Sequence, residues 1–161
     1  MIQNLKIKDK NDVYDFFSRV HDKHEDMYIT INNERKFFKN NWSLIEKTLS
    51  TQEVYGLYNN GLKAIMIIVK NKGFRPYVKL LAENSKYTID MLKFLKWNFL
   101  GQTLFFKLKK SNPLSNMIQK TGFYKIGDRG LECLFEKKAI KEIHKTTAKD
   151  DYLPQEEGRL Y

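Results

Sequence analysis

The chain has 161 residues, of which 42% are hydrophobic, and its formal net charge is +10. This length is typical of one domain with its own core, and the lone Cys133 excludes an intramolecular disulfide. The longest apolar run, residues 64–69, is too short to cross a membrane, and the N-terminus lacks the apolar stretch of a signal peptide, so we expect a cytoplasmic protein.

The excess of positive charge favours weak binding of polyanions such as nucleic acids or coenzyme A. The lysines are scattered along the chain and do not form one basic segment. The charge therefore predicts a weak, salt-sensitive affinity for nucleic acid and identifies no dedicated binding site.

The first third of the chain predicts one short strand and two helices. Residues 2–7 alternate well enough for a strand. Asp9 or Asn11 is suited to cap a helix, and a second helix is expected over residues 33–49. The apolar positions of the first helix, which recur at helical spacing, are Val13, Phe16, Phe17 and Val20.

A polar cluster lies between these two helices and contains residues of types that bind metals, namely His21, His24, Glu25 and Asp26. The two histidines are three positions apart, which is off the i, i+4 face of a helical metal site, and no cysteine lies nearby. We therefore expect a solvated helix end here and no metal site. The sequence also offers no Ser-His-Asp or Cys-His set for nucleophilic catalysis.

The middle of the chain predicts a hairpin followed by another strand. Residues 54–58 and 62–70 flank an Asn-Gly pair at 60–61, and this pair is a strong signal for a two-residue hairpin turn. Residues 64–69 are apolar without alternation, so their strand is expected to be central and covered on both faces. The next strand is expected over residues 77–82.

The longest predicted helix opens at Asn84 or Ser85 and reaches about Leu100. It is apolar around more than half of its circumference, so we expect it to be well buried, with Trp97 in the core. The remaining predicted elements are a strand at 103–108, a short helix at 113–121 and a hairpin formed by 123–126 and 131–136.

The predicted order is therefore β-α-α-β-β-β-α-β-α-β-β, which indicates an α/β (α+β) fold around a central mixed sheet. The apolar pattern fades after Lys138, and the net charge is +11 over residues 1–138 but −1 over residues 139–161. We expect a folded domain over 1–138 and an interaction arm over 139–161 that binds a protein partner or a second copy of the chain. The apolar anchors of this arm are Tyr152, Leu153, Leu160 and Tyr161.

This order resembles that of the GNAT acyltransferases, and the carboxyl half of the chain resembles them in local sequence. GNAT domains have an Asn near the end of the fifth strand, then a short helix, then a Gly-Phe pair that opens the last hairpin. Here these places are taken by Asn112, residues 113–121 and Gly122-Phe123. The resemblance spans about residues 1–138 and implies a GNAT-like fold.

Two parts of the GNAT pattern are missing. In that family a glycine-rich loop joins the fourth strand to the long helix, and its amides bind the pyrophosphate of acetyl-CoA; here the junction, residues 81–88, is shorter and has no glycine. Many members also use a tyrosine four residues before the Gly-Phe glycine as a general acid. Ile118 takes that place, beside Gln119, and neither side chain titrates, so no catalytic residue is assigned. If the chain is an enzyme, the resemblance implies that the cofactor is bound by Ser85, Lys86 and Asn112.

Two other groups have both a functional and a structural interpretation. Glu83 is a candidate general base, but we expect a solvated carboxylate at the start of the helix. Three tyrosines with Lys63, Lys79 and Arg75 nearby form a set able to stack on nucleic-acid bases, but half-buried sheet residues are their more common role. These tyrosines are Tyr55, Tyr58 and Tyr77.

Two hypotheses about function follow. In the first, which the missing loop favours, the chain is a non-catalytic GNAT-like protein that binds no cofactor and acts through protein or nucleic-acid contacts. Its losses resemble those of GNAT-like proteins encoded among the virion genes of short-tailed phages, which implies a virion or accessory role. In the second, the chain is a divergent N-acyltransferase that uses acetyl-CoA or a related donor and an unknown amine. The sequence alone thus predicts that acetyl-CoA does not bind specifically.

Overall fold

The structure, a computed structural model, describes residues 1–73 and 75–140. In chain order, the strands of this part are β1 (Ile2–Asn4), β2 (Tyr28–Ile31), β3 (Glu34–Phe37), β4 (Glu53–Tyr58), β5 (Leu62–Val69), β6 (Tyr77–Ala82), β7 (Leu104–Lys109), β8 (Tyr124–Arg129) and β9 (Glu132–Lys137). Its helices are α1 (Lys10–Arg19), α2 (Trp42–Thr51), α3 (Ser85–Asn98) and α4 (Leu114–Ile118), and 3-10 turns lie at Ile7–Asp9 and Gln119–Thr121.

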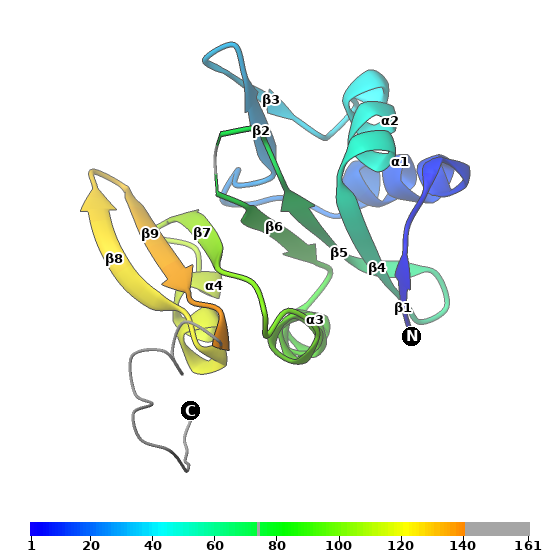
Figure 1. Cartoon of the computed structure of the whole chain (residues 1–161). Coiled ribbons are helices and arrows are strands. Elements are labelled where there is room, and N and C mark those ends of the chain that lie inside the picture. Colours follow the sequence, from blue (N-terminus) through cyan, green and yellow to red (C-terminus); the bar gives the residue numbers. More distant parts are fainter. Residues whose placement is uncertain (74, 141–161) are drawn as a thin grey trace.

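Over these residues, seven strands form one mixed sheet in the order β1-β4-β5-β6-β7-β9-β8, and β2 and β3 form a separate hairpin (Figure 1). All pairs of the large sheet are antiparallel except β6 with β7. The predicted mixed α/β fold is confirmed, and the hairpin β2-β3 is an addition to the predicted order.

The centre of the sheet follows from two strong local signals. Asn60 and Gly61 both have positive φ, 55° and 107°, as a tight hairpin turn between β4 and β5 requires. All residues of the apolar run 64–69 in β5 are buried, and they alternate between two separate cores. The predicted hairpin and the central position of β5 are therefore confirmed.

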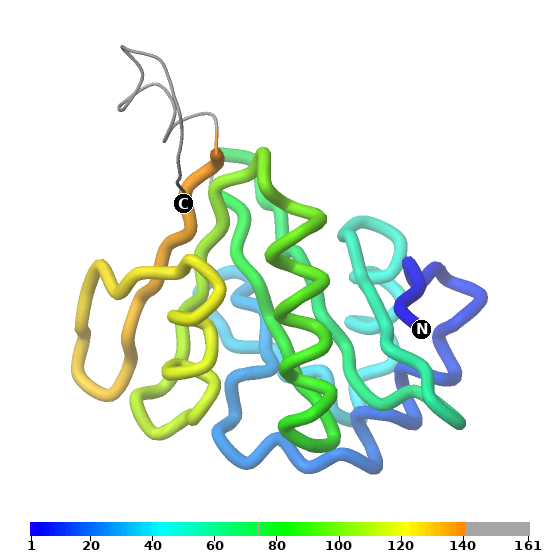
Figure 2. The backbone as a smooth tube through the Cα atoms, turned by 90° about the horizontal axis from the view of Figure 1, so that it is seen from below, coloured from blue at the N-terminus to red at the C-terminus, as the bar shows by residue number. Residues whose placement is uncertain are grey.

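Each face of the sheet has its own hydrophobic core. Helices α1 and α2 cover one face, where Phe16, Phe17 and Phe38 are buried. Helices α3 and α4 cover the other, where Phe106 packs edge-to-face on Phe123 at 5.0 Å between ring centroids. Figure 2 shows α3 lying along one side of the sheet, with α1 and α2 on the opposite side. No described helix is long and apolar enough to span a membrane.

The predicted helix over 33–49 is wrong in its first part. Asn32 and Asn33 have positive φ, 51° and 65°, and form the turn of the hairpin β2-β3. Helix α2 begins only at Trp42, where the side chain of Asn41 caps it by accepting the Leu44 amide at 3.2 Å. The β-branched stretch before Asn32 and the Asn-Asn pair were the signals for this hairpin.

The prediction that Trp97 lies in the core is also wrong. Helix α3 is present, but its buried residues are Met91, Leu92 and Leu95, whereas the Trp97 side chain is 65% exposed. Apolar residues on every side of a helix indicate that the helix is buried, but they do not show which side faces the sheet. Because β5 and β6 contact one side only, Trp97 faces away from them.

The backbone at Gly122 requires a positive φ, and a substitution there tests this requirement. Gly122 ends the 3-10 turn after α4 with φ of 95°, which L-residues rarely adopt, whereas an added Cβ would meet nothing closer than 3.9 Å. Gly122→Ala is therefore expected to cost about 1–2 kcal/mol of unfolding free energy through backbone strain alone. Urea denaturation measures this cost. Gly101→Ala is the matched control, because Gly101 has no positive φ and open space around it, and an equal loss in both variants contradicts the explanation.

The packed structure continues past the predicted boundary at Lys138, to the last described residues. Ala139 is buried and its amide donates to Thr103 Oγ1 at 3.1 Å, while the Ile140 amide donates to the Leu100 carbonyl at 2.8 Å. Most of the predicted arm over 139–161, including its apolar anchors, lies outside the described residues. Its role stays a prediction.

Candidate functional site

The sheet opens between β6 and β7. These parallel neighbours are paired at one register position, Tyr77 with Phe105, whereas β5 pairs with β6 along the whole of both runs from Ala64 to Val69 and from Tyr77 to Ala82. The pairing lies at the start of β6, so the two strands diverge toward their carboxyl ends (Figure 1). In open α/β sheets, ligands bind at the carboxyl ends of strands where the sheet parts.

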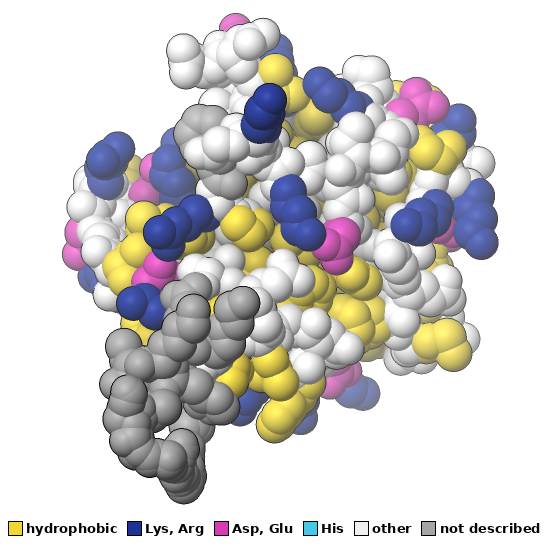
Figure 3. All heavy atoms as spheres, viewed as in Figure 1, with side chains coloured by type: hydrophobic (Ala, Val, Ile, Leu, Met, Phe, Trp, Pro, Cys, Tyr) yellow, Lys and Arg dark blue, Asp and Glu magenta, His cyan; other side chains and the backbone are white. Residues whose placement is uncertain are grey.

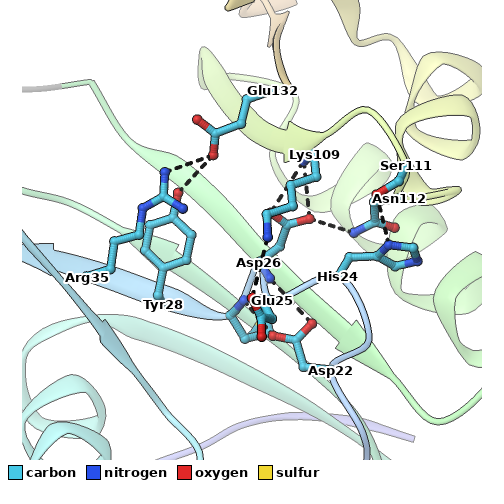
Figure 4. A network of polar contacts seen from close by, with 11 residues as sticks. Asp22, His24, Glu25, Asp26, Tyr28, Arg35, Lys109, Ser111, Asn112 and Glu132 are labelled. Carbon is cyan, nitrogen blue, oxygen red and sulfur yellow. Dashed lines mark hydrogen bonds and ion pairs between the residues drawn. The ribbon is translucent and has the colours of Figure 1, made fainter. Parts of the chain in front are cut away.

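Asp26, from the segment between α1 and β2, connects the middle of β6 with the carboxyl end of β7. Its side chain is 3% exposed and accepts hydrogen bonds from the Lys109 amide, at 3.3 and 3.4 Å, and from Asn112 Nδ2, at 2.9 Å (Figure 4). Its backbone carbonyl accepts from Lys79 Nζ of β6 at 3.1 Å. One residue thus fastens β6 to the end of β7 at the opening.

The local chain holds Asp26 in this position. Asp22 accepts the amides of Asp26 and Met27 at 3.4 and 2.9 Å, and Glu25 takes a positive φ of 53° (Figure 4). The solvated helix end predicted for this cluster holds for His21 and Glu25, which are exposed, but it is wrong for Asp26, which is buried. His24 contacts Ser111 Oγ at 3.2 Å. Within the described chain, no group of three His, Cys, Asp or Glu side chains is placed to hold a metal.

Lys79 is a buried cation on the face of β6 toward this segment. Its side chain is nearly inaccessible, and Nζ lies 3.8 Å from the centre of the Tyr28 ring. Burial lowers the pKa of Lys79 to about 8, although the charge of Asp26 acts in the opposite direction. The sequence favoured a half-buried sheet position for Lys79, and the structure buries its side chain almost completely.

A second buried lysine, Lys137, has its pKa lowered to about 8 by burial and donates to the carbonyls of Phe99 and Gln102. Both lysines lose their proton near pH 8 in the folded chain but near 10.5 in the unfolded chain, so the unfolded state binds more protons between these values. Unfolding free energy is therefore expected to rise from pH 7 to pH 9 by about 1 kcal/mol for each lysine. Urea titrations at both pH values measure the rise.

Lys79→Met is expected to remove about half of this rise, whereas Lys47→Met, on the exposed side of α2, should leave it unchanged. The comparison stops at pH 9 because the raised pKa of the Cys133 thiol and that of Tyr28 act in the opposite direction at higher pH. A flat or falling stability in the parent chain contradicts the burial of the two lysines.

Next to Lys79, Tyr28, Arg35 and Glu132 connect the hairpin β2-β3 to β9. Tyr28 donates to Glu132 Oε2 at 3.4 Å and Arg35 Nη2 to the same oxygen at 3.1 Å (Figure 4). Burial, and then the charge of Glu132, raise the pKa of Tyr28 to about 12, so its hydroxyl stays protonated and acts as a donor at neutral pH. Sequence reasoning missed this group, whose members lie up to 104 positions apart.

The junction after β6 carries two of the predicted cofactor-binding residues. Ser85 and Lys86 form the exposed first turn of α3, and the side chain of Asn84 accepts the Tyr87 amide at 3.3 Å. Glu83 is exposed, as expected for a solvated carboxylate at the start of the helix, and it is also ion-paired with Arg19 at 2.5 Å and with Lys63 at 3.7 Å. The negative charge of Glu83 at this junction is therefore compensated by two cations.

The third predicted residue, Asn112, has a different position. Its Nδ2 donates to Asp26, and its Oδ1 accepts the Leu114 amide at 3.0 Å at the start of α4. No hydrogen bond joins it to Ser85 or Lys86 among the described residues, so the three do not form one contact group. Ile118, in the place of the GNAT tyrosine, is completely buried in the core.

The tyrosines of the predicted base-stacking set are divided between the two faces of the sheet. Tyr55 packs on Phe94 and Phe99 beneath α3, while Tyr58 and Tyr77 lie on the face toward α1 and α2. They form no common platform, and the expected half-buried sheet role is confirmed.

A shallow hollow of about 220 Å³ lies apart from the opening, on β7, β8 and β9 around Leu134. Cys133 lines it but is buried, and its thiol donates to Asp128 Oδ1 at 3.1 Å.

Comparisons with known proteins find likeness in structure only. No protein-family model matches the chain, and no curated protein matches it. An N-acetyltransferase from Staphylococcus aureus is 16% identical, with a TM-score of 0.64 over 87% of this chain and 97% of that one. A variant of the spermidine N-acetyltransferase SpeG from Vibrio cholerae is 11% identical, with a TM-score of 0.62 over 91% and 97%. A GNAT-family acetyltransferase from Bacillus anthracis is 16% identical, with a TM-score of 0.57 over 84% and 92%.

At these identities the likeness concerns the fold and not the activity. It extends over 84 to 91% of this chain in these three structures. The chain therefore has the GNAT fold, the fold of these acetyltransferases.

Proposed function

We propose that this chain is a divergent N-acyltransferase, which takes an acyl group from acetyl-CoA or a related thioester and transfers it to an amine. The observation that carries the proposal is the opening between β6 and β7, with the first turn of α3 directly after β6, in a GNAT fold. This reverses the sequence-based expectation that acetyl-CoA does not bind. The structural neighbours named as acetyltransferases favour the reversal.

The first turn of α3 fits a phosphate in a reduced form of the GNAT cradle. The amides of Ser85 and Lys86 have no partner in the described structure, and an unpartnered helix N-terminus attracts anions. The Lys86 side chain adds an exposed cation, and Glu83 is neutralised by Arg19 and Lys63. The junction lacks the glycines that bring further amides to a pyrophosphate, so weaker donor binding than in a glycine-loop enzyme is expected.

A bound thioester donor supplies a carbonyl that a neutral amine attacks, with formation of a C–N bond and release of a thiol. The chain's own contribution at the opening is to hold its shape, through Asp26, which connects Lys79 of β6 with the end of β7, and through the contact of Lys79 with the Tyr28 ring. Ile118 has no proton to donate to a leaving thiolate, so in this proposal the thiolate takes its proton from solvent.

Titration calorimetry with acetyl-CoA at 0.15 and 0.5 M salt tests donor binding. A micromolar Kd, about −8 kcal/mol, that largely survives the higher salt is expected. Lys86→Glu should weaken binding at least about tenfold, because it places an anion where the phosphates bind. Lys47→Glu makes the same charge change on α2, on the opposite side of the sheet, and should not.

Two outcomes overturn the donor proposal. One is the absence of binding. The other is an affinity that disappears with salt and falls equally in both variants, because a chain of charge +10 attracts any polyanion in that way.

The second candidate function is a non-catalytic one, in which the chain acts through protein or nucleic-acid contacts, in a phage virion or as an accessory protein. One observation favours it: Asp26 and the segment around it already occupy the end of the opening, through contacts with both strands. Failure of acetyl-CoA to bind, together with capture of a stable partner by the full chain, supports this function against the first.

A further inference from the structure

The outer side of α3 carries an apolar patch that no described part of the chain covers. Its apolar members are Trp97, Ile89 and Leu100, which are 65%, 45% and 39% exposed. Lys93 and Lys96 lie on the same side, since at 100° per residue positions 89, 93, 96 and 97 fall within about a third of the helix circumference. These five residues are called the outer α3 patch. Hydrophobic side chains gather over α3 at the lower edge of Figure 3.

The outer α3 patch is basic as well as apolar. Its two lysines form no ion pair among the described residues, and Lys96 Nζ lies 5.2 Å from the centre of the Trp97 ring. The only carboxylate in α3 is Asp90, against Lys86, Lys93 and Lys96. An occupant of this patch therefore combines apolar side chains with negative charge.

The last described residue, Ile140, lies beside this patch. The Ile140 amide binds the Leu100 carbonyl, and Lys137 Nζ binds the Phe99 carbonyl at 2.7 Å, so the end of β9 is fastened to the end of α3. The tail that follows has a segment of matching chemistry, in which two aspartates at 150–151 directly precede Tyr152 and Leu153.

The length of the tail suffices to reach the patch. The ten residues from Ile140 to position 150 span up to about 33 Å when extended. The patch runs from Ile89 in α3 to Leu100, two residues after the helix ends, and these eleven steps correspond to about 16 Å at the rise of a helix. The segment therefore reaches every part of the patch without strain.

We propose that residues 150–153 bind the outer α3 patch of the same chain. Tyr152 and Leu153 cover the Trp97 ring, and the two aspartates face the lysines of the patch. The tail is then an arm directed at its own domain, rather than at a partner or a second copy as the sequence alone suggested.

Trp97 itself reports on this contact. In a Trp42→Phe background Trp97 is the only tryptophan, and acrylamide quenching of its emission measures its exposure in the full-length chain. Tyr152→Ala combined with Leu153→Ala should raise the quenching constant about twofold, because the covered ring becomes exposed again. The matched control, Leu160→Ala combined with Tyr161→Ala, removes the same two residue types from the tail and should leave quenching unchanged.

Charge reversal provides a second measurement. Asp150→Lys combined with Asp151→Lys should also raise the quenching constant of Trp97. High salt should raise the quenching constant of the parent chain as well. The proposal is overturned if Trp97 is equally quenched in the parent and in all variants, or if the control pair exposes it as well. Protection of Trp97 from acrylamide that grows with protein concentration also overturns the proposal, because the covering tail then belongs to a second copy.

Discussion

Replacing Asp26 by alanine is expected to lower the free energy of unfolding by about 2–4 kcal/mol. The carboxylate is buried and accepts both the Lys109 amide and Asn112 Nδ2, and alanine leaves these two donors without a partner. The carboxylate charge that favours protonated Lys79 is lost as well. Urea denaturation of the full chain at pH 7 measures the loss.

Glu25→Ala is the matched control for Asp26→Ala. Glu25 is the adjacent carboxylate, but it is 69% exposed and its only ion pair among the described residues, with Lys109, is 3.6 Å long. Its removal should cost less than about 0.5 kcal/mol. If the two variants lose the same stability, Asp26 does not hold β6 and β7 in the way described.

Truncation of Leu95 to alanine is expected to lower unfolding free energy by about 2–5 kcal/mol, because its fully buried side chain packs in the core beneath α3. Trp97→Ala, two residues later in the same helix, should cost less than about 1 kcal/mol although it removes the larger side chain. Thermal and urea unfolding of the two variants compare them directly.

The order of these two losses is the informative result. Alanine is the best helix former, so helix propensity favours both variants and does not explain a difference between them. A large loss at Trp97 with little at Leu95 contradicts the placement of α3 on the sheet.

The sheet was predictable because its signals are local. The Asn-Gly turn and the unbroken apolar run 64–69 specify the hairpin β4-β5 and its central position. The hairpin β2-β3 was missed because the aromatic residues around Phe37 and Phe38 fit a helical period as well as a strand. The signal that distinguishes the two is the Asn-Asn turn before them.

The polar group at the opening was not predictable in the same way. Asp26 binds Lys109 and Asn112, which lie 83 and 86 positions away, and no local pattern distinguishes it from its solvated neighbour Glu25. Burial of Trp97 failed for a related reason, since helical periodicity shows that apolar residues are present but not which of them meets the sheet. Ser85 and Lys86 were placed correctly at the first turn of α3, because the N-cap signal of Asn84 is local.

Hydrogen–deuterium exchange of the full chain, with and without saturating acetyl-CoA, tests the proposed function most directly. A donor bound in the opening is predicted to slow exchange in residues 78–88, which include β6 and the first turn of α3, and near the end of β7. Strand β1 at the far edge of the sheet should be unaffected. Unchanged exchange throughout the chain at saturating acetyl-CoA, or protection confined to segments away from β6 and α3, would contradict donor binding at this site.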